Sequence, residues 1–216
     1  MSYASPQAGV ILIDPPWAYQ NMRESVNGAA SSHYVTMTDE DILDLPLASL
    51  ASDDCVLACW ATWPRLDLAL ACIGNWGWRY VTAIPWVKYV PCAKEKPAIR
   101  RGVGFWSMAA SEVLLLAARG APKRQGDRSD TPIGLLTGDD RVFWAPRSKH
   151  SRKPNEVHDW LERRHVGPYL ELFARRPRDG WTCWGGDLGY RIDRKGVHDV
   201  REPWRLHEEM VNEGDV

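Results

Sequence analysis

The sequence predicts an α/β fold with a doubly wound sheet, and three observations carry this prediction. Apolar runs of strand length at 10–13 and 55–60 lack polar alternation, which is typical of strands covered on both faces. Residues 64–73 place apolar side chains at helical spacing, and a third strand-like run follows at 80–87. Alternation of strand and helix favours helices on both faces of a largely parallel sheet, the arrangement of Rossmann-like proteins.

The first strand ends abruptly at Asp14, which two prolines and Trp17 follow. Proline lacks a backbone N–H and cannot continue a sheet ladder, so the strand stops at the acid. The carboxyl ends of strands in an open α/β sheet form the ligand crevice, where Asp14 is well placed for chemistry. A planar amine would fit there, with one N–H on Asp14, the other on the Pro15 carbonyl, and its ring stacked on Trp17. A Pro-Pro turn beside a solvated Asp is the alternative.

The bulk properties favour one soluble enzyme-sized domain. The chain has 216 residues and a formal net charge of -1, so binding to nucleic acid must come from local basic patches. Its five cysteines form no Cys-x-x-Cys pair, which indicates reduced thiols and a cytoplasmic location. Neither a signal peptide nor an apolar run of membrane-spanning length is present. Most of the twelve tryptophans are expected in the core or at its rim.

Residues 18–32 are rich in Asn, Ser, Gly and Ala without periodicity, which predicts a loop near the site, either a lid or a disordered connector. Thr38 and Asp41 then form an S/T-x-x-D/E start for a helix that contains Ile42 and Leu43. Tyr34 stands just before this helix. Packing of its ring on the helix start is one role for Tyr34.

The stretch 88–101 is basic, with one acid, Glu95, against Lys88, Lys94, Lys96, Arg100 and Arg101. Gly102 and Gly104 precede Phe105 and Trp106, and such a mixture suits a loop that contacts phosphates and unstacked bases. A solvated charged face is the alternative.

Glu112 begins the apolar run 113–117, where an unpaired acid would be costly. It therefore needs a partner, either a base edge or a neighbouring Arg. A long surface loop is expected over 119–140 and a short strand over 142–145.

The last third of the chain predicts one helix and two strands. Pro154 opens a helix with Val157, Trp160 and Leu161 on one face. Strands follow over 169–176, with an internal acid at Glu171, and over 180–184, before a glycine turn. After Tyr190 the chain is charged and aperiodic, so we expect a domain over 1–190 and a tail or docked arm over 191–216.

The order Asp14-Pro15-Pro16-Trp17 resembles the signature tetrapeptide of amino-methyltransferases that act on adenine N6, in the form typical of the MT-A70 family. That family contains the catalytic subunit of the eukaryotic mRNA adenosine methyltransferase and many bacterial and phage proteins. Residues 150–154 resemble its H-S-x-K-P motif, and 171–175 its E-L-F-x-R motif. The resemblance spans Ile11 to Asp187 and implies a Rossmann-like methyltransferase sheet of permuted order, with the catalytic motif before the cofactor motif.

The resemblance also implies which residues serve the site. Asp14, Pro15, Pro16 and Trp17 would be catalytic. The target base and its strand would be bound by residues from the middle of the chain: Tyr34, Trp86, Lys88, Arg101, Trp106 and Glu112. S-adenosylmethionine would contact Lys153, Glu171, Arg175, Gly186 and Asp187. The family has Asn where this chain has Gly186, so the contact that this Asn would make to the cofactor ribose is in doubt. Asp187 could replace that contact. For Lys153 and Glu171, structural salt bridges are the alternative.

The expected activity is therefore transfer of a methyl group from S-adenosylmethionine to adenine N6 in DNA by direct in-line attack. This reaction needs positioning of the amine and preorganised electrostatics. No metal site is expected, because the histidines lack the spacing of metal ligands. RNA is the alternative substrate, and a catalytically silent nucleic-acid-binding partner subunit is the alternative from another class. The expected partner is DNA or RNA, and no association with a membrane is expected. The sequence leaves open a homodimer or a related partner subunit.

Overall fold

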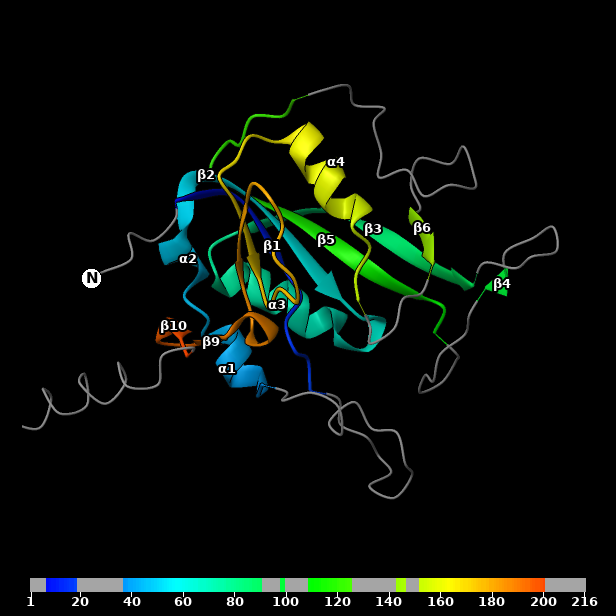
Figure 1. Ribbon diagram of the computed structural model, residues 1–216, viewed down its shortest axis with the longest axis horizontal. Coiled ribbons are helices and arrows are strands. Elements are labelled where there is room, and N and C mark those ends of the chain that lie inside the picture. Colours follow the sequence, from blue (N-terminus) through cyan, green and yellow to red (C-terminus); the bar gives the residue numbers. More distant parts are fainter. Residues whose placement is uncertain are drawn as a thin grey trace, which may run out of the picture.

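The computed structural model describes residues 7–18, 37–90, 98–99, 109–125, 143–146 and 152–200. Within these residues a single large sheet of eight strands forms the centre of the molecule (Figure 1), in the order β4-β3-β5-β2-β1-β7-β8 with β6 beside β3. The strands are β1 (Ala8–Ile13), β2 (Ala51–Ala61), β3 (Arg79–Val90), β4 (Ala98–Ile99), β5 (Ser111–Arg119), β6 (Phe143–Pro146), β7 (Tyr169–Leu172) and β8 (Trp181–Trp184).

The central strands are parallel. β1 pairs in parallel with both β2 and β7, and β7 pairs in parallel with β8. β5 is the main exception, because it runs antiparallel to both of its neighbours, β2 and β3. The predicted α/β class and largely parallel sheet are confirmed. The antiparallel direction of β5 could not be predicted, because a fully apolar run such as 113–117 does not reveal the direction of its strand.

Helices cover both faces of the sheet (Figure 1), and each face carries a separate core. Ile11 and Ile13 of β1 face a core built with α1 (Asp39–Leu43), α2 (Leu47–Leu50) and α3 (Leu66–Asn75). Val10 and Leu12 face the opposite core, which contains α4 (Glu156–Arg164). Successive side chains of a strand point to opposite faces, so this unbroken apolar run fills both cores. The doubly wound arrangement is confirmed.

The predicted helix starts are found in the structure. The Thr38 hydroxyl accepts a hydrogen bond from the Asp41 backbone N–H at 3.1 Å and donates to the Asp41 carboxylate at 2.8 Å, which caps α1. Pro64 lies in a 3-10 turn, Trp63–Arg65, that leads into α3. In α4 the predicted apolar face is buried: Val157, Trp160 and Leu161 are each at most 5% exposed.

β7 ends four residues earlier than predicted. Its last residue is Leu172, and Phe173 takes a φ of 60°, in the left-handed region that a bulky side chain rarely adopts. The chain therefore turns at the carboxyl edge of the sheet. Ala174 then donates its backbone N–H to the Trp184 carbonyl at 3.0 Å, which ties the turn to β8.

The sequence predicts a tail or docked arm over 191–216 but gives no sign of strands there, whereas residues 190–199 are regular. They form a two-stranded antiparallel hairpin, β9 (Tyr190–Asp193) and β10 (Gly196–Asp199). Ile192 is 8% exposed and belongs to the core beneath β1, so the hairpin packs with the domain. Strands of four residues flanked by charges give little periodic signal. Residues 201–216, including Trp204, lie outside the described residues.

Most indole rings and thiols are buried, as expected. Seven tryptophans are at most 8% exposed: Trp17, Trp60, Trp76, Trp78, Trp86, Trp160 and Trp181. Cys55, Cys59 and Cys72 are free and buried, and burial raises the pKa of the Cys55 and Cys72 thiols to about 12. Among the helices in the described ranges, none is long and apolar enough to cross a membrane.

Candidate active site

Asp14 lies where the winding of the sheet reverses. It directly follows β1, between the carboxyl ends of β2 on one side and β7 on the other. The chain reaches β2 through helices on one face, and it reaches β7 after α4, which packs on the opposite face. Such switch points open a crevice outside the carboxyl ends of the strands, where α/β proteins bind ligands. The predicted place of Asp14 at a strand end is confirmed.

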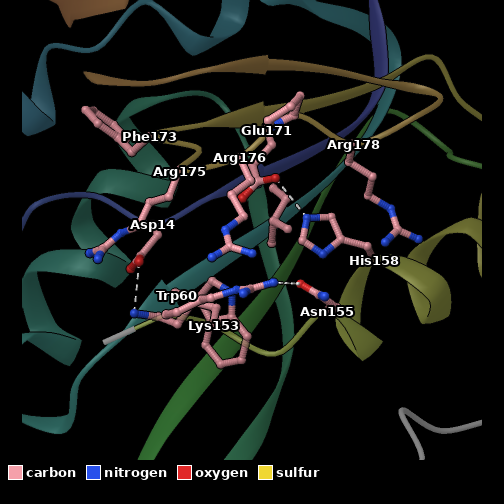
Figure 2. A pocket seen from close by; sticks show the side chains of 13 residues that line it. Asp14, Trp60, Lys153, Asn155, His158, Glu171, Phe173, Arg175, Arg176 and Arg178 are labelled. Carbon is pink, nitrogen blue, oxygen red and sulfur yellow. Dashed lines mark hydrogen bonds and ion pairs between the residues drawn. The ribbon is translucent and has the colours of Figure 1, made fainter. Parts of the chain in front are cut away.

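A pocket occupies this crevice (Figure 2). It encloses about 730 Å³, with the open space at its mouth included. Its walls come from the ends of β1 and β2, from the segment that leads into α4, and from the turn after β7: Leu12, Asp14, Trp60, Arg152, Lys153, Asn155, His158, Glu171, Phe173, Arg175, Arg176, Pro177 and Arg178.

Lys153 joins two acids at the edge of this pocket. Its Nζ lies 2.9 Å from the Asp14 Oδ2 and 3.2 Å from the Glu112 Oε2. Glu112 also pairs with Lys88 through its other oxygen. The side chains of Lys153, Asp14 and Glu112 are 15%, 23% and 7% exposed. We call Asp14, Lys153, Glu112 and Lys88 the acid–lysine chain.

Burial and neighbouring charges shift the pKa values of Asp14, Glu112 and Lys153. Burial raises the pKa of the Asp14 carboxyl, and the charge of Lys153 only partly opposes this effect. For Glu112 burial acts in the same direction, but the charges of Lys153 and Lys88 outweigh it and lower the pKa. Burial acts to lower the pKa of Lys153, but the charges of Asp14 and Glu112 outweigh burial and raise this pKa above its ordinary value. The Lys153 ammonium therefore stays charged. Positive charge is thus fixed beside the Asp14 carboxylate.

This geometry supplies ion-pair partners for two predicted site residues. Glu112 has a partner, as the sequence indicates, and the protein partners are Lys88 and Lys153, in place of the expected Arg. Lys153 pairs with Asp14 and Glu112, so the salt-bridge alternative describes it in this structure. The identity of these partners depends on strand β5 lying two strands from β1, which no local pattern gives.

The proline carbonyls are less open than predicted. Pro15 accepts the backbone N–H of Trp17 at 2.8 Å, and Pro16 accepts that of Met37 at 3.2 Å. Each carbonyl oxygen has two lone pairs, so one acceptor position remains on each. Turn hydrogen bonds therefore replace the missing sheet partners.

The rings of Trp17, predicted as a stacking surface, and of Trp86, predicted to bind substrate, are buried in this structure. Trp17 is 5% exposed and donates its indole N–H to the Trp60 carbonyl at 3.0 Å. Trp86 is 1% exposed and donates to the Ala145 carbonyl at 3.2 Å. Burial of such large apolar rings contributes to the core, and the indole N–H groups of Trp17 and Trp86 both find acceptors there. The hydrogen bond of Trp17 ties the segment after β1 to the end of β2.

The proposed cofactor residues divide into two groups. Lys153, Glu171 and Arg175 line the pocket, whereas Gly186 and Asp187 are exposed in the 3-10 turn Gly186–Leu188 and are not part of its lining. Glu171 forms a hydrogen bond with His158, whose Nε2 lies 2.8 Å from the Glu171 Oε2 (Figure 2). The salt-bridge alternative for Glu171 thus has a definite partner.

Sequence reasoning missed His158 and Trp60 as pocket residues. His158 follows Lys153 by five positions and Asn155 by three, so helical spacing places it near the same wall. The buried nitrogens Trp60 Nε1 and His158 Nδ1 have no hydrogen-bond partner among the described residues. Unsatisfied buried polar atoms in a pocket wall are what a polar ligand would complete.

Three predicted substrate residues, Tyr34, Arg101 and Trp106, lie outside the described residues. So do most of the predicted loops over 18–32 and 119–140 and the residues His150 and Ser151.

The neighbouring glycines at 185 and 186 should respond oppositely to substitution. A Cβ at Gly185 would lie 2.1 Å from the Ala174 carbonyl oxygen, whereas a Cβ at Gly186 would meet nothing within 4 Å. We expect Gly185→Ala to lower the free energy of unfolding by about 2 kcal/mol, and Gly186→Ala to leave it nearly unchanged. Urea denaturation measures both. Equal destabilisation by the two variants would contradict this packing.

Comparison with known proteins agrees with this site. The MT-A70 family model matches residues 8–187. The chain is 30% identical over 198 residues to a probable N(6)-adenosine-methyltransferase MT-A70-like protein of Oryza sativa subsp. japonica, covering 88% of this chain but 24% of that protein. It is 27% identical to the Type II methyltransferase M.MunI of Mycoplasma sp, covering 83% of this chain and 77% of that protein.

A third relative is the human N(6)-adenosine-methyltransferase catalytic subunit METTL3, 29% identical over 191 residues that cover 88% of this chain and 28% of METTL3. The chain spans about a quarter of the length of the rice relative and of a similar Arabidopsis thaliana protein. The family match runs from the start of β1 to the turn after β8, and so includes Asp14, Lys153 and Glu171. This chain belongs to the MT-A70 family.

Proposed function

We propose that this protein is an S-adenosylmethionine-dependent DNA adenine N6-methyltransferase. The observation that carries the proposal is the position of Asp14: it begins an Asp-Pro-Pro-Trp segment at the switch point of the sheet and borders a pocket with unsatisfied polar atoms. The family match and the names of the relatives support the same chemistry.

The residues of the pocket suit S-adenosylmethionine. Its ammonium and ribose hydroxyls are donors, for which the Glu171 carboxylate is an acceptor, and its carboxylate is an acceptor, for which the Trp60 indole N–H is a donor. Arg175 lines the same space. When bound, the cofactor supplies a methyl group on a positively charged sulfur.

Asp14 and the free acceptor position of Pro15 would then hold the amine. Accepting both N6 hydrogens localises the nitrogen lone pair, which is otherwise conjugated with the adenine ring, and directs it toward the methyl group. Lys153 fixes the Asp14 carboxylate by an ion pair at 2.9 Å, so the acceptor is already oriented before the base arrives. The residues thus contribute by positioning and charge, with no covalent intermediate.

DNA is favoured over RNA by the way the chain matches its relatives. The chain is similar over 83% of its own length to the Type II methyltransferase M.MunI, and the match covers 77% of that protein. RNA is the second candidate because METTL3 and the N6-methyladenosine RNA methyltransferase MTA1 of Pyricularia oryzae are also similar. In a duplex the target adenine would have to be flipped out of the stack.

The test is a methyl-transfer assay with the purified chain, radiolabelled S-adenosylmethionine, and DNA and RNA oligonucleotides of matched sequence, each single- and double-stranded. The modified nucleosides are identified by mass spectrometry. We expect N6-methyladenine in DNA at a higher kcat/KM than in RNA. A preference for RNA would overturn the choice of DNA, and label on another base would overturn the assigned chemistry.

The remaining alternative is a catalytically silent partner subunit. Isothermal titration with S-adenosylmethionine distinguishes it, because the proposed function requires binding of the cofactor. Absence of both cofactor binding and methyl transfer, with nucleic acid still bound, would favour the silent subunit.

A further inference from the structure

Trp63 differs from the buried tryptophans of this chain. The seven named above are at most 8% exposed, whereas Trp63 is 45% exposed. It begins the 3-10 turn Trp63–Arg65, which directly follows β2. Much of the ring surface is therefore open to solvent, where a flat partner can cover it.

The ring of Trp63 is held in place. Its indole N–H donates to the Ser111 hydroxyl at 2.8 Å, across from the start of β5. The turn beneath it is closed by the backbone N–H of Arg65, which donates to the Thr62 carbonyl at 2.9 Å, and Pro64 fixes φ in that turn. A ring that is already oriented loses little conformational freedom when it binds a flat partner.

The position of Trp63 relates it to the acid–lysine chain. β2 and β5 are antiparallel, and Ala61 pairs with Val113, so Trp63 lies at the same edge of the sheet as Asp14. Its hydrogen-bond partner Ser111 precedes Glu112, which pairs with Lys153. Consecutive strand residues point to opposite faces, so Trp63 lies on the face of the sheet opposite the Glu112 side chain, at the carboxyl edge that also carries Asp14.

We propose that Trp63 is a stacking platform for a nucleobase next to the target adenine. This proposal rests on the proposed function, because it requires a nucleic-acid strand at the carboxyl edge of the sheet. Extrusion of the target base from its stack exposes a face of its neighbour, and an anchored indole beside the site can cover that face. Stacking tolerates any base, because every base has a π-face, so Trp63 contributes affinity for the strand with little sequence preference.

The test combines protein variants with abasic substrates. Trp63→Ala, Trp63→Phe and Tyr80→Ala are compared with the unmodified chain on an oligonucleotide with one adenine. Tyr80 is the matched control, since it is an exposed aromatic residue, 44% exposed, at the start of β3 on the opposite edge of the sheet. Kd is measured by fluorescence anisotropy, and kcat and KM by methyl transfer. Abasic positions are placed in turn on each side of the adenine.

We expect Trp63→Ala to raise Kd and KM for the oligonucleotide about ten-fold, Trp63→Phe to recover most of the loss, and Tyr80→Ala to change neither. For the unmodified chain, an abasic position on one side of the adenine should raise Kd by a similar factor. For Trp63→Ala, the same abasic position should raise Kd no further. Equal losses for both proteins on both abasic substrates would overturn the proposal, as would unchanged Kd for Trp63→Ala. Thermal unfolding of each variant excludes a folding defect.

Failure of the stacking platform can be distinguished from failure of the proposed function. Anisotropy needs no turnover, so the comparison of Trp63→Ala with the abasic oligonucleotides can be made even if the chain transfers no methyl group. Methyl transfer that is unaffected by Trp63→Ala would overturn only the stacking platform. A change in oligomeric state on Trp63→Ala, without a change in Kd, would assign the ring to a protein contact instead.

Discussion

Asp14→Asn is expected to reduce kcat/KM for methyl transfer about a thousand-fold. The amide keeps the size of the side chain, but it loses the charge and one of the two acceptor oxygens that would hold the amine. Loss of one preorganised polar group at a reacting centre typically costs a factor of about 10²–10³. Asp14 borders the pocket and pairs with Lys153. The substitution therefore also removes that ion pair and leaves Lys153 paired with Glu112.

The measurement is kcat/KM on the preferred oligonucleotide, together with titration of S-adenosylmethionine. Cofactor affinity should change by less than a factor of about three, because the mutation keeps the shape of the wall. Asp14→Ala serves as a second variant with no hydrogen-bonding group. Full methyl transfer by either variant would contradict the assignment of Asp14 as the acceptor of the amine.

Lys153→Met is expected to lower the free energy of unfolding by about 3 kcal/mol near pH 7.5. The variant keeps the length of the side chain but leaves Asp14 and Glu112, 23% and 7% exposed, without the ammonium between them. An unpaired buried carboxylate is costly, although water at the pocket mouth screens Asp14 in part. Glu112 retains Lys88, so most of the penalty falls on Asp14.

The loss of stability should depend on pH. In the variant the folded-state pKa of Asp14 rises further above its unfolded value, so the folded state binds protons more tightly than the unfolded state. Its stability is then highest below the unfolded pKa, near 4, and falls as the pH rises through the folded-state pKa. In the unmodified chain Glu112 has a lowered pKa and acts in the opposite sense, losing stability as the pH falls.

Urea denaturation at pH 5 and pH 8 measures this dependence. The difference between Lys153→Met and the unmodified chain should be small at pH 5 and large at pH 8. Lys153→Met combined with Asp14→Asn removes the unpaired charge and should recover most of the stability at pH 8, which makes it the control. A difference that does not change with pH would show that lost packing, not charge, causes the effect.

Some parts of this structure follow from local sequence. Val10 to Ile13 are apolar and strand-forming, and two prolines then end the ladder, so the position of Asp14 at a strand end could be predicted. The cap at Thr38 and the apolar face of α4 also depend on residues within a few positions of each other. Glu112 could be predicted to need a partner, because an acid in an apolar strand does.

Other parts depend on which strands are neighbours. Lys153 reaches both Asp14 and Glu112 only because β1 and β5 flank β2 in the sheet, although 98 positions separate the two acids. The same packing decides that Trp17 and Trp86 are buried while Trp63 is exposed, a difference that the residue type alone does not carry. The hairpin over 190–199 is held by Ile192 in a core built mainly from distant residues.

The sequence by itself therefore determined the α/β class, the family motifs, the place of the candidate catalytic acid at a strand end, and the need of Glu112 for a charge partner. Only the tertiary structure decided that Lys88 and Lys153 supply that partner, which tryptophans face the solvent, and which side chains line the pocket. The physical reason is range: strand ends, caps and helix faces are fixed by steric and hydrogen-bonding rules over a few residues, whereas ion pairs and ring burial depend on contacts between strands far apart in the chain.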